Sequence, residues 1–176
     1  MRQTFVALAI AAGIGLSASV ALSPLAFSQE QTTASADQID YSGFSQLTAD
    51  LEDYRRTRLV SLEHFKVLAA ADDTLILDTR SADAFARGHI SGAVNLPFSD
   101  FTSESLAQVI GDQSRRILIY CNNNFANDEP PVMLKRAPLA LNIPTFINLY
   151  GYGYQNIYEL GEVVDFNDPA VDWVSG

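Results

Sequence analysis

Downstream of residue 44, the apolar positions of the chain follow helical and strand spacing in turn. Apolar residues that recur three or four positions apart indicate a helix with one buried face, whereas short unbroken apolar runs indicate buried strands. We therefore expect helices at 45–59, 62–70, 103–110 and from Pro144 to Tyr150, a helical turn after Ser81, and strands at 74–77, 93–96, 117–120 and 156–160. This alternation predicts an α/β domain with a mainly parallel central sheet flanked by helices.

The first 44 residues have a different pattern. Residues 5–22 contain no charged side chain and are rich in Ala, Ile, Leu and Val, and only Arg2 precedes them with a positive charge. Ala26-Phe27-Ser28 offers a small-residue cleavage site, so residues 1–28 are predicted to be a secretory signal peptide. The alternative is an uncleaved membrane anchor, because the apolar run approaches the length of a bilayer span. Beyond it we expect three further parts: a linker at 29–44, an N-terminal helical extension at 45–58 and the main domain at 59–170.

Charge limits the possible partners. Removing the leader takes away Arg2 and leaves ten basic residues against 21 acidic ones, a net charge of −11. Such a chain is repelled by nucleic acid and by anionic lipid, so we expect neither as a partner and no stable membrane association after cleavage. The predicted location is the periplasm or the extracellular medium. One cysteine and two histidines, far apart in sequence, give no metal-binding pattern, and we expect no metal and no cofactor.

The cysteine, Cys121, directly follows the predicted strand 117–120. In an oxidising compartment a single cysteine has no internal disulfide partner, so it is buried, paired with another chain, or reactive. Three asparagines follow, and Asn tolerates a positive φ, which lets the chain curl and turn its N–H groups toward an anion. The predicted active-site loop consists of Asn122, Asn123, Asn124, Phe125, Ala126 and Asn127. The alternative is an inert, packed thiol.

Two further motifs precede Cys121, namely Asp78-Thr79-Arg80 and the segment Gly88-His89-Ile90-Ser91-Gly92-Ala93-Val94-Asn95-Leu96-Pro97. Together with a strand that ends in a cysteine, they resemble the rhodanese-like domain, and the resemblance covers about residues 59–161. It implies a sulfurtransferase whose Cys121 thiolate takes sulfane sulfur from a donor such as thiosulfate, holds it as a persulfide and passes it to a thiophilic acceptor. The small donor and the acceptor are then the expected partners, and a protein partner is a further option.

Six residues of these motifs are expected to support the site rather than to react: Asp78, Arg80, Gly88, His89, Gly92 and Asn95. Asp78 and Arg80 are interpreted as a partly buried charge pair or as donors and acceptors for neighbouring loops. His89 is interpreted as fixing its loop, with general-base catalysis as the alternative. The two glycines are expected to allow backbone conformations that a side chain would block, and Asn95 to satisfy backbone groups of a turn.

The loop after Cys121 departs from the family pattern, which often has Gly and Arg there and leads straight into a helix. Here Asp128 and Glu129 would raise the pKa of the thiol, and Pro130-Pro131 delay the helix. The nearest cations, Lys135 and Arg136, are candidate anion contacts. Asn127 stands where a cysteine phosphatase needs its arginine, six residues after the cysteine, which argues against phosphatase chemistry. The alternative function is a binding module with little or no activity, whose loop 122–143 recognises a partner or small ligand.

Overall fold

The computed structural model describes residues 38–175. The predicted signal peptide, 1–28, and residues 29–37 of the predicted linker lie outside this range. The helices are α1 (Tyr41–Arg56), α2 (Leu62–Ala69), α3 (Ala82–Arg87), α4 (Ser103–Val109) and α5 (Asn142–Gly151). The strands are β1 (Leu59–Val60), β2 (Thr74–Asp78), β3 (Gly88–Ile90), β4 (Ala93–Asn95), β5 (Arg116–Tyr120), β6 (Ile157–Leu160) and β7 (Trp173–Ser175). Short 3₁₀ turns are η1 (Phe98–Asp100), η2 (Asn122–Asn124), η3 (Ala137–Leu139) and η4 (Pro169–Val171).

Five strands form one parallel sheet in the order β1-β6-β5-β2-β4. The α/β prediction is therefore confirmed. Strand β5 lies at the centre, between β6 and β2, and its last residue, Tyr120, is the register partner of Asp78 at the end of β2. A second sheet, which the sequence pattern did not indicate, is formed by β3 and β7, and these two strands pair antiparallel. Within residues 38–175, no helix combines the length and the apolar character that crossing a membrane requires.

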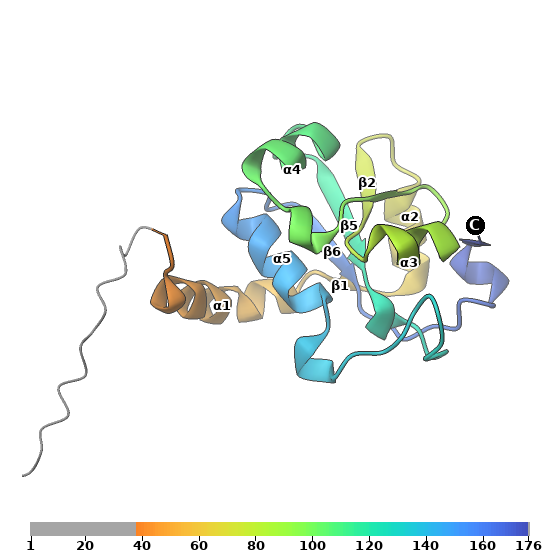
Figure 1. The fold of residues 1–176 in the computed structure, drawn as a ribbon. Coiled ribbons are helices and arrows are strands. Elements are labelled where there is room, and N and C mark those ends of the chain that lie inside the picture. Colours follow the sequence, from red (N-terminus) through yellow and green to blue (C-terminus); the bar gives the residue numbers. More distant parts are fainter. Residues whose placement is uncertain (1–37, 176) are drawn as a thin grey trace, which may run out of the picture. The chain divides into compact units, whose positions relative to one another are not determined.

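Helices cover both faces of the parallel sheet (Figure 1). Because successive residues of a strand point to opposite faces, the unbroken apolar runs of β2 and β5 feed two separate cores. One core combines Leu77 and Ile119 with side chains of α4 and α5, and the other combines Ile76 and Leu118 with Phe65 of α2. The central strand β5 is thus packed on both faces. This packing fixes the backbone position of Cys121, the next residue.

Helix α1 is longer at its start than predicted and shorter at its end. It begins at Tyr41, inside the range expected to be linker, because the Asp40 carboxylate accepts a hydrogen bond from the Gly43 N–H at 2.8 Å and caps the first turn. It ends at Arg56, so that Leu59, expected at the end of the helix, instead opens β1. Leu51 of α1 is buried, and Tyr54 packs its ring against those of Phe146 and Tyr150 in α5. The N-terminal extension is therefore packed onto the domain.

Candidate functional site around the Cys121 thiol

Cys121 directly follows the central strand, at the carboxyl edge of the parallel sheet, where open α/β folds place their ligand sites. Its exposed fraction is only 1%. The three asparagines form the turn η2, in which the Asn124 N–H donates to the Cys121 carbonyl at 3.0 Å. The expectation of positive φ in this curl is wrong, because Asp128 and Asp172 are the positive-φ residues other than glycine in 38–175. A 3₁₀ turn achieves the same change of direction with ordinary φ values.

Three backbone N–H groups near the thiol, those of Asn123, Leu141 and Asn142, lower the pKa of Cys121 by hydrogen bonding. The last two belong to the N-terminus of α5, whose partial positive charge favours a thiolate. The prolines do delay this helix along the chain, but the polypeptide returns after 20 residues and brings the helix N-terminus back to Cys121. Burial is the larger effect, however, and leaves the pKa of the thiol raised above its ordinary value.

Asn124 holds the turn from inside the protein. Its Oδ1 accepts hydrogen bonds from the Cys121 N–H and from Nδ2 of Asn142, both at 2.9 Å. Its Nδ2 donates to the carbonyls of Leu160 at 2.7 Å and Glu162 at 3.1 Å. One buried amide therefore joins the cysteine, the start of α5 and the end of β6.

The next part of the predicted loop is fixed to the C-terminal segment of the chain. Phe125 is fully buried and sets its ring edge-on to Trp173, with centroids 5.0 Å apart. The Ala126 N–H donates to the Val164 carbonyl at 2.9 Å. Asn127 donates to Asp165 at 2.8 Å and accepts from the Phe166 N–H at 3.1 Å. These residues anchor the loop to the C-terminal segment.

Residues 128–140, which we call the lid, fold back onto the asparagine turn. Nδ2 of Asn122 donates to the Met133 carbonyl at 2.8 Å. The Asn123 side chain donates to the Lys135 carbonyl at 2.7 Å and accepts from the Lys135 N–H at 3.1 Å. Lys135 and Arg136, the candidate anion contacts, have exposed side chains, and Lys135 reaches the turn through its backbone. The lid is thus held to the turn by polar bonds and to the interior by Val132, which is fully buried in the core cluster that contains Phe125 and Tyr120.

The carboxylate that raises the pKa of Cys121 is not in the lid. Asp128 instead accepts a hydrogen bond from the Leu134 N–H at 2.9 Å. The effect comes from Glu159 of β6, which is 4% exposed and paired with Arg55 of α1. Sequence reasoning missed both residues. The one acidic residue within the apolar run 156–160 could have indicated a buried ion pair, because a buried charge needs a partner of opposite sign.

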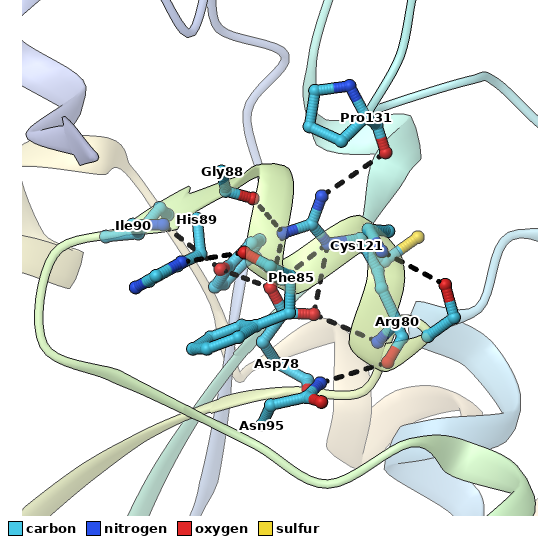
Figure 2. Close-up of polar contacts among 12 residues, drawn as sticks. Asp78, Arg80, Phe85, Gly88, His89, Ile90, Asn95, Cys121 and Pro131 are labelled. Atoms are coloured by element: carbon cyan, nitrogen blue, oxygen red, sulfur yellow. Dashed lines mark hydrogen bonds and ion pairs between the residues drawn. The ribbon is translucent and has the colours of Figure 1, made fainter. Parts of the chain in front are cut away.

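Asp78 and Arg80 form a fully buried ion pair beside the thiol, not in contact with it (Figure 2). Nε of Arg80 lies 3.0 Å from both carboxylate oxygens, and Nη2 also donates to the Gly88 carbonyl at 2.8 Å. Nδ2 of Asn95 donates to the backbone carbonyls of Asp78 and Arg80 at 2.9 and 3.0 Å. The Cys121 sulfur points away from the guanidinium in Figure 2. The geometry supports a structural role for all three side chains.

The Gly88–Gly92 segment is held from two sides. Nδ1 of His89 lies 2.9 Å from the Phe85 carbonyl, and its ring stacks on that of Phe85 at 3.8 Å, which supports the loop-fixing role. Gly92 has φ +80°, as the conformational argument expects. For Gly88 that argument is wrong, since its backbone is extended. Here a Cβ would instead lie 2.5 Å from Nε1 of Trp173, so only a glycine fits against the indole.

The Asp78–Arg80 motif, the Gly88–Pro97 segment and Cys121 lie at the same edge of the fold. A comparison with family models identifies the family. The family model for the rhodanese-like domain matches residues 61–161, more than half of the chain. The chain belongs to the rhodanese-like domain family. Within this rhodanese-like domain, residues 38–175 contain no group of three or more His, Cys, Asp or Glu side chains able to hold a metal ion.

Three solved structures are similar to parts of this chain at low sequence identity. A crystal structure of the Alr3790 protein from Anabaena sp. is 22% identical, covers 57% of this chain and 68% of its own, and has a TM-score of 0.43. The solution structure of the rhodanese-like domain of that protein is also 22% identical, covers 58% and 67%, and has a TM-score of 0.42. The structure of EanB/C412S with hercynine is 20% identical, covers 58% of this chain and 23% of that one, and has a TM-score of 0.44. A comparison with curated proteins finds no match.

Two parts of the described protein lie outside the family match. Helix α1 precedes it and contributes Arg55, and the segment after residue 161 follows it and contributes Trp173. The surroundings of Cys121 therefore include side chains that the family pattern does not specify.

Proposed function

We propose that this rhodanese-like domain is an exported sulfurtransferase that carries sulfane sulfur as a persulfide on Cys121. The observation that carries the proposal is the convergence of the Asn123, Leu141 and Asn142 N–H groups on the thiol. Preorganised donors beside a sulfur atom stabilise the thiolate that forms there, which is the nucleophile of the transfer. The family match supports the same framework over residues 61–161.

The chemistry proceeds in two displacements. The Cys121 thiolate attacks the outer sulfur of thiosulfate, a bond forms between the two sulfur atoms, and the S–S bond of thiosulfate breaks so that sulfite leaves with the electron pair. A thiophilic acceptor, such as cyanide or a thiolate, then attacks the outer sulfur of the persulfide. The bond between Sγ and that sulfur breaks, and the electron pair returns to Cys121 as a thiolate.

The buried state of Cys121 adds a condition to this proposal. With 1% of the residue exposed and the pKa of the thiol raised, the closed protein offers little thiolate to a donor. Because residues 133–139 of the lid are exposed and held to the asparagine turn by three hydrogen bonds, local opening of this stretch is the expected route of access. The proposal therefore requires lid opening before each sulfur transfer.

The same burial favours a second candidate function. A rhodanese-like binding module with little or no turnover would keep its thiol buried and use the segment 122–143 for recognition. Met133, Leu134 and Leu139 of the lid are apolar yet 43–65% exposed, which suits a protein contact better than a small-molecule cavity.

A transfer assay separates the two functions. Purified protein and its Cys121→Ser variant are incubated with thiosulfate or polysulfide, and cyanide-releasable sulfur is measured together with the intact mass. We expect wild-type protein to gain the mass of one sulfur atom and to release thiocyanate, and the variant to do neither. If no donor loads wild-type Cys121, even at alkaline pH where the thiolate forms, the sulfurtransferase proposal is overturned and the binding function is favoured.

A further inference from the structure

Arg55 connects the N-terminal helix with the surroundings of Cys121. It lies in α1, outside the family match at 61–161. Its Nε donates to Oε2 of Glu159 at 2.8 Å and its Nη2 to Oε1 at 2.6 Å, so the pair is bidentate. The exposed side-chain fractions are 28% for Arg55 and 5% for Glu159. This is the geometry in which a guanidinium fixes a carboxylate most firmly.

Glu159 in turn faces the residue that holds the thiol. The Asn142 side-chain amide donates to Oδ1 of Asn124 at 2.9 Å. Hydrogen bonding by Asn142 also lowers the pKa of Cys121, through its backbone N–H, and the pKa of Glu159, through its side chain. Burial raises the pKa of Glu159, and the Arg55 ion pair opposes this rise. The Arg55–Glu159 ion pair thus lines the same cavity as Asn142, whose side chain meets the Cys121 N–H at Oδ1 of Asn124.

Arg55 is the one cation among the described residues that line the adjoining cavity. A cavity of about 230 Å³ adjoins the site, and the charged side chains that line it are those of Arg55, Glu159 and Glu162. The Glu162 carboxylate accepts a hydrogen bond from the Leu62 N–H at 2.7 Å. Among the residues that line the cavity, Arg55 is therefore the one positive charge beside two negative ones.

These contacts have an electrostatic consequence. An ionised carboxylate near the start of α5 opposes the partial positive charge that the helix offers to a thiolate. A bidentate guanidinium cancels most of that opposition, since the pair as a whole is neutral. The loop after Cys121 carries no arginine within six residues, so the compensation has to come from another element.

We propose that Arg55 is a positioning residue for Cys121, which neutralises Glu159 and so lets the N-terminus of α5 stabilise the thiolate. Arg55 acts through Glu159 and does not touch the sulfur. The inference rests on the proposed function only in that Cys121 reacts as a thiolate. It gives the N-terminal extension a specific part in the site, in addition to its packing on α5.

The test is the titration of Cys121 in charge variants. Thiolate formation is followed by the ultraviolet difference spectrum against Cys121→Ser and by the pH profile of alkylation, in the alkaline range where an unpaired Glu159 is ionised. In Arg55→Gln we expect a higher thiol pKa and alkylation about tenfold slower at a given pH, as for a shift of about one unit. In Glu159→Gln we expect a lower pKa and faster alkylation, and the double variant should follow Glu159→Gln.

Arg56→Gln is the matched control, because Arg56 is the next residue of α1 but pairs with the exposed Glu52 and Asp53. It should titrate as wild type, and Arg55→Lys should restore part of the wild-type profile. An Arg55→Gln titration that coincides with that of Arg56→Gln overturns the proposal, as does a Glu159→Gln pKa at or above the wild-type value. If Arg55→Gln does not fold, Glu159→Gln decides alone. The titration needs no sulfur transfer, so it separates failure here from failure of the proposed function.

Discussion

The phenol of Tyr120 donates a hydrogen bond to Oδ2 of Asp78 at 2.6 Å, between two residues that are register partners at the ends of β5 and β2. The same hydroxyl accepts a hydrogen bond from the Ile90 N–H at 3.1 Å. Burial, and then the charge of Asp78, raise the pKa of Tyr120 well above its usual value, so the hydroxyl keeps its proton. One phenol thus links the central sheet to β3, immediately before Cys121.

Removing this hydroxyl should weaken the fold. In Tyr120→Phe, the Ile90 N–H and one oxygen of Asp78 lose a partner in a buried place, and we expect the free energy of unfolding to fall by about 1–3 kcal/mol. Urea denaturation measures it. Tyr152→Phe is the control, because its hydroxyl makes only a 3.4 Å contact at the surface and should matter much less. Equal losses in both variants would contradict the linking role of Tyr120.

The buried ion pair should be more sensitive still. Asp78→Asn leaves the Arg80 guanidinium without its counter-charge in the interior, and we expect a loss of about 3–5 kcal/mol of unfolding free energy. Asp83→Asn breaks an exposed pair with Arg87 on α3 and should change stability little. Urea denaturation curves of the two variants compare the losses of unfolding free energy directly. A mild effect of Asp78→Asn would mean that the interior tolerates an isolated Arg80.

The lid should open more often when its attachment is weakened. Asn123→Ala removes both hydrogen bonds between this side chain and the Lys135 backbone. At about 1 kcal/mol for each bond, we expect iodoacetamide to modify Cys121 roughly tenfold faster or more. Asn127→Ala is the control, since Asn127 makes two comparable bonds to residues 165 and 166 instead. If the alkylation rates of the two variants rise equally, general loosening rather than the lid controls access.

The raised pKa of Cys121 predicts a pH dependence of its reactivity. Below that pKa the thiolate fraction, and with it the rate of alkylation or sulfur loading, should increase about tenfold per pH unit. Stopped-flow alkylation over a pH series checks this slope. A flat profile through neutral pH would show that the thiolate already predominates, contrary to the effect of burial.

The free energy of unfolding should fall as the pH rises, whereas the reactivity of Cys121 should increase. Because the folded pKa lies above the unfolded one, the folded state holds the thiol proton more tightly. The contribution of this group to stability is therefore complete below the unfolded pKa and is lost as the pH rises through the folded pKa. The difference in unfolding free energy between wild type and Cys121→Ser, followed across that range, should shrink accordingly.

Local patterns were sufficient to predict the parallel sheet and the position of Cys121. The strands at 74–77 and 117–120 were predicted within one residue, because buried parallel strands are unbroken apolar runs. The helical face of α2 and its Ser61 cap were equally readable from neighbouring residues. Each of these predictions depends on residues close together in the sequence.

The parts that sequence reasoning missed depend on residues far apart in the chain. Arg55 and Glu159 are separated by 104 positions, and neither alone indicates an ion pair near the thiol. The β3–β7 pairing joins the glycine segment to the last residues of the described chain. Nothing near Gly88 in the sequence indicates that an indole will occupy the space of its missing side chain. The return of α5 to Cys121 likewise depends on tertiary packing beyond the prolines.

Strand β7 also determines where the protein can be cut. The family match ends at residue 161, yet Trp173 packs against Phe125, and the Arg80 guanidinium lies over its ring, 5.4 Å from the centroid. A recombinant fragment trimmed to residues 61–161 would lose this indole and, at its other end, Arg55. The smallest segment that keeps every contact described around Cys121 begins at Asp40, the cap of α1, and extends through β7 to residue 175.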